Sequence, residues 1–201
     1  MSMTQKKMTR SSQNKLISIG VDVGTVNGAI AIVDEDMQIL LLTKAPTFQT
    51  ELKHKRNKDK LNKETGKFER DYRKKSWLDF KEVGKLFKPY VGRRVIYTIE
   101  RLIPRSDERE SSSFTNGNSM GIFQGLYSLL EPVEYYEPLP ITWKSDLGVT
   151  SDKETSVKLA ENIYEIKLRD YLKRGKVDDI AEALLLAFYG FRQYFTTKGD
   201  K

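Results

Sequence analysis

Four acidic residues stand where short apolar runs of the chain end, or where a run with helical spacing begins. Two of them close runs rich in β-branched residues, and the other two lie three positions apart near the start of the last apolar run. The four are Asp22, Glu100, Asp179 and Glu182. Residues three apart are neighbours on a helix surface, so Asp179 and Glu182 share a face. All four are therefore candidates for one carboxylate site.

Such a site would bind divalent cations. Ionised carboxylates that lie close together repel one another, and bound cations relieve that repulsion. Oxygen ligands of this kind select hard ions, so we expect Mg²⁺ or Mn²⁺. The chain has no Cys and a single His, His54, which excludes thiol chemistry and sites built from several histidines. Any metal chemistry must use carboxylates.

Each acid also has an ordinary structural interpretation. An Asp that ends a strand, such as Asp22, is often part of a turn, and an Asp at a helix start, such as Asp179, often caps the helix. Glu100 is harder to explain in this way, because it follows the apolar run 95–99 and Glu is poorly suited to burial. The argument for a site therefore rests on the acids as a set.

The elements that must position these acids follow from hydrophobic periodicity and turn residues. We expect strands at 16–22, 29–33, 38–43, 95–99 and 133–136. We expect helices at 77–90, 120–130 and 178–194, a helical turn at 141–147, a polar loop at 106–113, and a helix opened by a capping box of Ser151 and Glu154. The first and fourth strands should be neighbours, which places Asp22 beside Glu100, and the last helix should bring Asp179 and Glu182 against them.

Length and composition predict one α/β domain. The chain has 201 residues, 38% of them hydrophobic, which is enough for one core and too little for two independent domains. We expect the domain to span 16–195, between a disordered basic tail at 1–15 and a short tail at 196–201. No segment approaches the roughly 20 apolar residues that cross a bilayer, so we expect a cytoplasmic protein with no membrane partner.

A basic insert at about 46–76 separates the third strand from the helix that follows it. Residues 51–75 contain eleven Lys or Arg and five Asp or Glu, a net charge of 11 − 5 = +6 in a chain whose total is +7. This favours a polyanionic partner such as nucleic acid. We expect a DNA-contacting arm; the alternative is a loop whose charges are simply solvated. Its candidate DNA contacts are Lys53, Lys55, Arg56, Lys58 and Lys60.

Four segments together resemble the successive motifs of a known nuclease family. They are IGVDVGTVNGAIAIVD at 19–34, TIER at 98–101, PITWKSDLGV at 140–149 and VDDIAEALLLA at 177–187. In this order they resemble RuvC-type Holliday junction resolvases of the RNase H-like superfamily, most closely the phage-encoded members. The first segment alone is also similar to the start of sugar kinases and heat-shock ATPases.

The resemblance implies an RNase H-like fold with a five-stranded mixed sheet, three antiparallel strands followed by two parallel ones, flanked by helices. It implies that Asp22, Glu100, Asp179 and Glu182 hold two Mg²⁺ or Mn²⁺ ions, which activate a water and stabilise the leaving 3′-oxygen. It also implies a homodimer that makes paired nicks in four-way junctions, with the helix at 120–130 as its interface. A phage-encoded member would act in the host cytoplasm, and forks and Y-structures are further branched substrates.

Lys144, in the third segment, is the candidate for a phosphate contact beside the site, and Arg101 is a second one. Leu102, Ile103 and Phe114 flank the polar loop where resolvases place residues that enter the junction, but we expect these three to pack in the core.

The chain departs from the family in two places. Glu182 stands where the family usually has Asp, and Asp178 shares the same helix face, which leaves Asp178 and Asp179 as alternatives; we prefer Asp179 because it lies three residues before Glu182. The basic insert resembles no family motif.

Two other functions remain open. One is a noncatalytic protein that binds branched DNA. The other is an ATP-using protein of the same superfamily, in which DVGT at 22–25 would form a phosphate loop.

Overall fold

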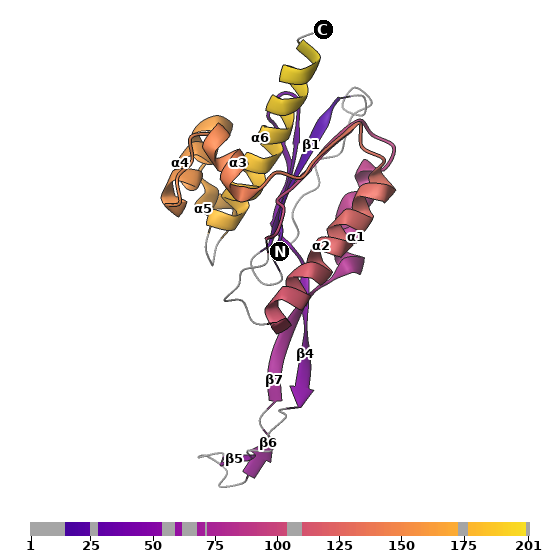
Figure 1. The fold of residues 1–201 in the computed structure, drawn as a ribbon, viewed down its shortest axis with the longest axis vertical. Coiled ribbons are helices and arrows are strands. Elements are labelled where there is room, and N and C mark those ends of the chain that lie inside the picture. The colour runs from indigo at the N-terminus through magenta and orange to yellow at the C-terminus, as the bar shows by residue number, and fades with distance from the viewer. Residues whose placement is uncertain are drawn as a thin grey trace.

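The computed structural model describes residues 15–24, 28–53, 59–61, 68–70, 72–103, 110–172 and 177–199 (Figure 1). The strands are β1 Ile17–Asp22, β2 Ala29–Asp34, β3 Ile39–Lys44, β4 Thr47–Lys53, β5 Asp59–Leu61, β6 Phe68–Arg70, β7 Tyr72–Leu78, β8 Val95–Ile99 and β9 Glu134–Tyr136. The helices are α1 Phe80–Phe87, α2 Glu110–Leu130, α3 Pro140–Asp146, α4 Lys153–Tyr164, α5 Leu168–Tyr171 and α6 Asp178–Gly199, with a 3-10 turn, η2, at Lys88–Tyr90.

The main sheet has five strands in the order β3-β2-β1-β8-β9. The first three pair antiparallel, β8 pairs parallel with β1, and β9 pairs parallel with β8. Three antiparallel strands followed by two parallel ones is the arrangement predicted from the sequence. The fold is therefore α/β and RNase H-like.

Two hydrophobic clusters cover the two faces of this sheet. Along β1 the residues alternate between the two faces, as period-two strands require. Ile17, Ile19 and Val21 join the cluster with α1 and α2, whereas Ser18 and Gly20 face α6. Figure 1 shows α6 and the shorter helices α3, α4 and α5 on one side, and α1 and α2 on the other. Layers on both faces leave the strand ends as the open parts of the sheet.

Helix α6 lies directly against β1, and two glycines make this possible. A Cβ at Gly20 would lie 2.1 Å from the carbonyl oxygen of Ala183 and 2.4 Å from the amide nitrogen of Ala187. A Cβ at Gly190 would lie 2.4 Å from Oγ1 of Thr98 on β8. The hydroxyl of Ser18 donates to the carbonyl of Ala187 at 2.7 Å. Helix and sheet therefore meet backbone to backbone, with α6 running opposite to β1.

The basic insert forms paired strands. β4 and β7 pair antiparallel from Thr47 opposite Leu78 to Lys53 opposite Tyr72, and β5 pairs with β6. Figure 1 shows this ribbon projecting from the body of the domain. These strands belong to two small sheets apart from the five-stranded one; contact of the insert with DNA stays a prediction.

Several predicted boundaries were wrong. The helix expected at 77–90 begins at Phe80, because Trp77 and Leu78 are β7 residues and Asp79 caps α1 by accepting from two amide groups. Residues 110–113, expected in the polar loop, belong to α2. The cap of α4 is Asp152 rather than Ser151, since the carboxylate of Asp152 accepts from the amide of Glu154. The last helix extends five residues beyond 194, to Gly199.

Two of the three residues expected in the core beside the polar loop are exposed. Ile103 is 57% exposed and Phe114 is 66% exposed, whereas Leu102 packs against the α1 and α2 cluster. Residues 1–14 of the expected tail and residues 106–109 of the expected polar loop lie outside the described residues. Among the residues that are described, no helix is long and apolar enough to span a membrane.

Candidate active site

Asp22 and Glu100 lie side by side at the carboxyl ends of two adjacent parallel strands. The last paired residues of β1 and β8 are Val21 and Ile99, and the amide of Glu100 donates to the carbonyl of Val21 at 3.1 Å, which extends the ladder by one residue. The expectation that the first and fourth predicted strands are neighbours is confirmed. Both acids are half-buried at the sheet end.

The start of α6 brings Asp179 and Glu182 to the same place. The helix crosses Gly20, two residues before Asp22, through Ala183, so its first turn lies over the end of β1. The amino end of a helix carries a partial positive charge that favours nearby carboxylates. The close approach at Gly20 therefore sets the position of the helical acids relative to the strand acids.

The carboxylates act on one another electrostatically. Burial raises the pKa of Asp22 well above its usual value, and the charges of Glu100, Glu182 and Asp179 raise it further, while Lys144 lowers it. Within the part of the chain that the structure describes, no hydrogen-bond donor meets the Asp22 carboxylate. Asp22 is thus the acid on which the other three converge, and the one that a cation would stabilise most.

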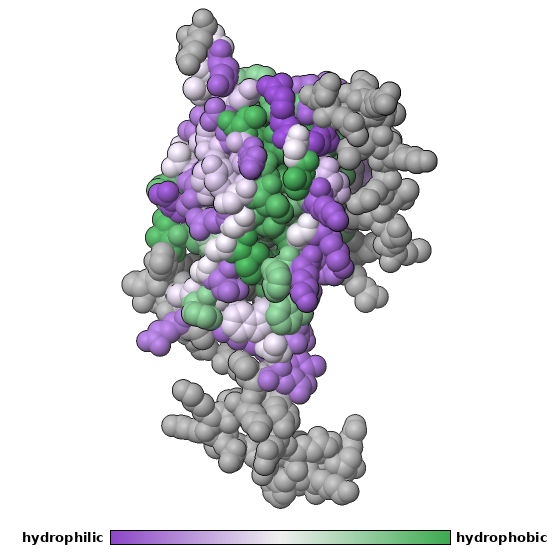
Figure 2. Space-filling model, turned by 90° about the vertical axis from the view of Figure 1, so that its right-hand side faces the viewer, coloured by the Kyte–Doolittle hydropathy of each residue, from purple (hydrophilic) through white to green (hydrophobic). Residues whose placement is uncertain are grey.

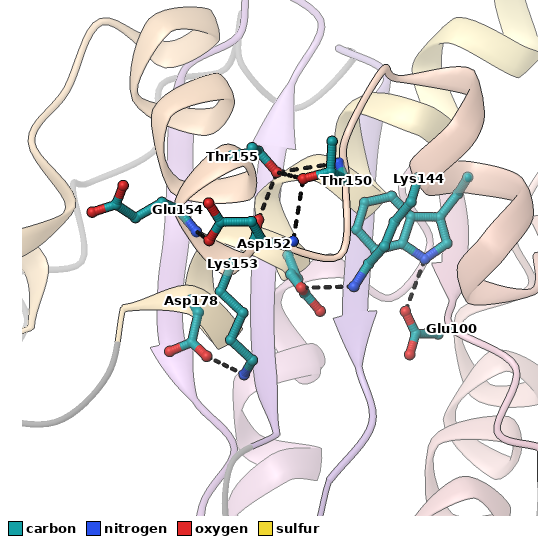
Figure 3. Close-up of polar contacts among 10 residues, drawn as sticks. Glu100, Lys144, Thr150, Asp152, Lys153, Glu154, Thr155 and Asp178 are labelled. Carbon is teal, nitrogen blue, oxygen red and sulfur yellow. Dashed lines mark hydrogen bonds and ion pairs between the residues drawn. The ribbon is translucent and has the colours of Figure 1, made fainter.

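Glu100 is held by a neighbour from α3. The indole nitrogen of Trp143 donates to its carboxylate at 2.8 Å (Figure 3). Burial raises the pKa of Glu100, the hydrogen bond from Trp143 opposes this, Glu182 raises it and Lys144 lowers it. Trp143 is fully buried, so the donor has a fixed position.

Three lysines from three elements pair with the acids of α6. Lys44 at the end of β3 pairs with Asp179, and Lys144 of α3 pairs with Glu182 at 2.8 Å. Lys153 at the start of α4 pairs with Asp178, and Figure 3 shows its amine directed at that carboxylate. Asp179 acts on Asp22 whereas Asp178 turns toward α4, which favours Asp179 as the member of the cluster.

Sequence reasoning found Lys144 but missed Lys44, Lys153 and the donor role of Trp143. A signal for Lys44 exists in the strand register. Ala29 of β2 lies opposite Asp22 on one side and opposite Lys44 on the other, so a correct antiparallel alignment places Lys44 at the same sheet end as Asp22. Lys153 carries no comparable signal, because helix packing alone decides where α4 lies.

The chemistry of these donors fits Mg²⁺ or Mn²⁺, since every candidate ligand is a carboxylate oxygen. Their arrangement is not that of an assembled metal centre. Among the described residues, no three Asp, Glu or His side chains lie close enough together to hold an ion. The amines of Lys44 and Lys144 neutralise Asp179 and Glu182 instead.

None of the remaining predicted DNA-binding residues whose side chains the structure describes pairs with one of the four acids. Arg101, next to Glu100, pairs with Glu137 at 3.0 Å. Lys53 ends β4 and Lys60 lies in β5, both in the ribbon. Lys55, Arg56 and Lys58 are not among the described residues.

Fold and site together define an RNase H-like domain with a cluster of carboxylates at the carboxyl ends of its central strands. No protein-family model matches the chain, and no curated protein sequence does. Among solved structures, T. thermophilus RuvC in complex with a Holliday junction substrate is similar, with 11% sequence identity and a TM-score of 0.49 over 91% of this chain and 96% of that one. The fold assignment rests on the strand order described above.

Proposed function

We propose that this protein is a divalent-metal-dependent endonuclease that resolves four-way DNA junctions and cuts other branched DNA such as forks and Y-structures. The observation that carries the proposal is the shared position of the four acids. Asp22 and Glu100 follow adjacent parallel strands, and the contact of Ala183 with Gly20 places the first turn of α6, which carries Asp179 and Glu182, over the same sheet end. Acids are costly to gather in this way unless cations bind among them.

In this proposal the four acids hold two Mg²⁺ or Mn²⁺ ions. The bound ions supply an activated water and stabilise the departing 3′-oxygen of the phosphodiester. To hold the ions, Asp179 and Glu182 would exchange their ion pairs with Lys44 and Lys144 for the metal, and both amines would then be available to contact phosphate oxygens. Trp143 keeps Glu100 oriented throughout, because its ring is buried and its N–H already meets the carboxylate.

The choice of branched DNA rests on the four motifs that resemble RuvC-type resolvases and on the charge of the insert. The ribbon segment 51–75 carries a net charge of 11 − 5 = +6, which suits a phosphate backbone. The four motifs contain all four acids and Lys144. The residues proposed for phosphodiester cleavage are therefore the same residues that carry the resemblance to junction resolvases.

We further propose that the protein acts as a homodimer through the face that carries α2. Figure 2 shows hydrophobic residues gathered in a band on the side of α1 and α2. On α2 itself, Tyr127 is 37% exposed and Leu129 is 51% exposed. The two side chains point to different sides of the helix, since Tyr127 packs against Tyr135 of β9, so Leu129 is the side chain that an interface on the outer side of α2 would cover.

The ion pairs at the site favour a second function, a noncatalytic protein that binds branched DNA. Lys44 and Lys144 already neutralise Asp179 and Glu182, so the cluster has cations of its own. In that case the acids would be structural, and the protein would bind junctions without cutting them.

One experiment separates the two functions. A matched panel of labelled four-way junction, fork, Y-structure and linear duplex DNA is incubated with the protein in Mg²⁺, Mn²⁺ or EDTA. The nuclease predicts cleavage of branched DNA that needs the ion and leaves the linear duplex intact. Binding of the junction with no cleavage in either ion would establish the noncatalytic function.

A further inference from the structure

The base of the ribbon carries a group of aromatic side chains on one face. Phe48 of β4 lies directly opposite Trp77 of β7, and directly opposed residues of an antiparallel pair share a face. The ring of Phe114 on α2 makes a T-shaped contact with the ring of Trp77, with 6.3 Å between ring centroids. Phe48 is 44% exposed and Phe114 is 66% exposed. Three elements, β4, β7 and α2, thus present three aromatic rings together, two of which are exposed.

Two polar neighbours contact the central ring, Trp77: one fixes its plane and the other places a positive charge over it. The indole nitrogen of Trp77 donates to the hydroxyl of Thr50 at 2.9 Å, which fixes the ring plane. The amine of Lys75 lies over the ring, 4.5 Å from its centroid. We call Phe48, Trp77, Phe114 and Lys75 the aromatic platform. The rings of Phe48 and Phe114 are exposed to solvent and can stack on a base, and Lys75 adds a cation at Trp77 that can contact a phosphate.

The platform lies at the same end of the sheet as the four acids. β3 ends at Lys44, which pairs with Asp179, and β4 starts three residues later at Thr47. Directly after β7, the amide of Asp79 donates to the carbonyl of Pro46 at 2.8 Å. This hydrogen bond joins the two chain ends at the base of the ribbon. A DNA strand that leaves the acids along this edge therefore meets the base of the ribbon.

Charge complementarity points to a nucleic acid as the occupant of this surface. The segment that rises from the platform carries a net charge of +6 over residues 51–75, 11 − 5. Exposed aromatic rings interleaved with basic side chains are the combination that binds single strands, because each base can stack on a ring while its phosphate contacts a cation. An apolar protein partner would explain the rings but not the charge.

We propose that the aromatic platform stacks unpaired bases of single-stranded DNA at the branch of the substrate. The proposal rests on the proposed function and deepens it, because it names the feature of branched DNA that the protein recognises. Phe48 and Lys75 belong to the insert and Trp77 directly follows it, and none of the three lies in a segment that resembles a resolvase motif. Recognition of unpaired bases would thus be a property added to the nuclease domain by this insert.

The test measures binding in EDTA, where no cleavage is needed, with fluorescent oligothymidylate and a duplex of equal length as probes. Phe114→Ala is the safest variant, because the side chain is exposed and Ala is the best helix former. Trp77→Leu is the stronger variant, and Trp77→Phe keeps a ring. Phe195→Ala is the matched control, a Phe that is 51% exposed near the far end of α6.

Removal of one stacking ring weakens binding of a single strand by roughly tenfold or more. We expect that effect for Phe114→Ala and Trp77→Leu with oligothymidylate, a change of less than about twofold with duplex, and little change for Trp77→Phe or Phe195→Ala. Equal weakening on both probes, or none on either, would overturn the proposal. Failure of this proposal would leave the proposed nuclease activity untouched. Conversely, the platform could bind oligothymidylate even if the protein does not cleave DNA.

A second readout does not depend on affinity. The chain has two Trp residues, and Trp143 is fully buried whereas Trp77 is partly exposed. A base that stacks on an indole quenches its fluorescence, so saturating oligothymidylate should quench the wild type and leave Trp77→Phe unquenched. Equal quenching of both proteins would show that bases do not stack on Trp77.

Discussion

Trp143 donates its indole N–H to the carboxylate of Glu100, with 2.8 Å between Nε1 and Oε2. The two residues come from α3 and from the end of β8, and Trp143 is fully buried. Burial raises the pKa of Glu100, and this hydrogen bond opposes the rise. The contact therefore keeps one strand acid oriented toward Asp22 without adding a charge to the cluster.

Removal of a single carboxylate should abolish cleavage. A proposed metal ligand is removed by each of the variants Asp22→Asn, Glu100→Gln and Asp179→Asn. Loss of that ligand should remove several kcal/mol of transition-state stabilisation and slow cleavage about a hundredfold or more. Glu182→Gln should act in the same direction. Junction affinity should change little, because each variant keeps every positive charge. Single-turnover cleavage and gel-shift titrations measure the two effects separately.

Asp178→Asn is the matched control for this set. It removes a neighbouring acid of the same helix turn that pairs with Lys153 rather than facing Asp22. We expect it to keep most of the cleavage rate. If Asp178→Asn were inactive and Asp179→Asn active, the two residues would have to exchange roles.

Cleavage should require Mg²⁺ or Mn²⁺ and fail in Ca²⁺. Ca²⁺ takes more ligands at longer and less regular distances, which positions the scissile phosphate poorly for in-line attack. The measurement is junction cleavage after the protein is stripped with EDTA and restored with each ion. Efficient cleavage in EDTA would end the metal hypothesis.

Gly20→Ala should lower stability and cleavage together. A methyl group there would lie 2.1 Å from the backbone oxygen of Ala183, and overpacking against backbone costs about 3 kcal/mol and displaces the helix. Gly84→Ala is the matched control, because nothing lies within 4 Å of a Cβ at that position in α1. It should stabilise the protein by roughly 0.5–1 kcal/mol. Urea unfolding and junction cleavage of both variants test this; equal stabilities would refute the close packing.

Neutralising the ribbon should weaken DNA binding without changing chemistry. The variant combines substitution of Lys53, Lys55, Arg56, Lys58 and Lys60 by Gln. The slope of log K against log salt should flatten by roughly 0.9 for each phosphate that the variant no longer neutralises, on every form of DNA. Cleavage at saturating protein should persist. An unchanged salt slope would mean that these charges are only solvated.

The protein should be a dimer that makes paired nicks. Leu129 on α2 is 51% exposed, so Leu129→Lys should disfavour the dimer by placing charge in an apolar interface. Sedimentation of the wild type and the variant, free and on junction DNA, measures the association. Junctions nicked in one strand should accumulate with the variant and convert to doubly nicked product with the wild type. A wild type that stays monomeric on DNA would exclude this arrangement.

Strand order and the place of the strand acids could be predicted from sequence. β1, β2 and β8 are buried apolar runs with clear ends, and the pairing of two such runs in parallel leaves Asp22 and Glu100 adjacent. The start of α6 could be predicted equally well, because its apolar residues recur at helical spacing. The strand boundaries in and after the insert could not be predicted. β7 contains Lys and Arg among its seven residues and has no alternating apolar pattern.

The sequence by itself determined which carboxylates stand at the ends of strands and at the start of the last helix. Strand periodicity, helical spacing and turn residues are local properties of the chain, so they can be seen without the fold. Only the tertiary structure decided their partners. Lys44 meets Asp179 across 135 residues and Trp143 meets Glu100 across 43, through the contact of α6 with Gly20 and the packing of α3 beneath the sheet end. Such contacts depend on how whole elements pack, and packing is a property of the assembled core that no single segment of sequence encodes.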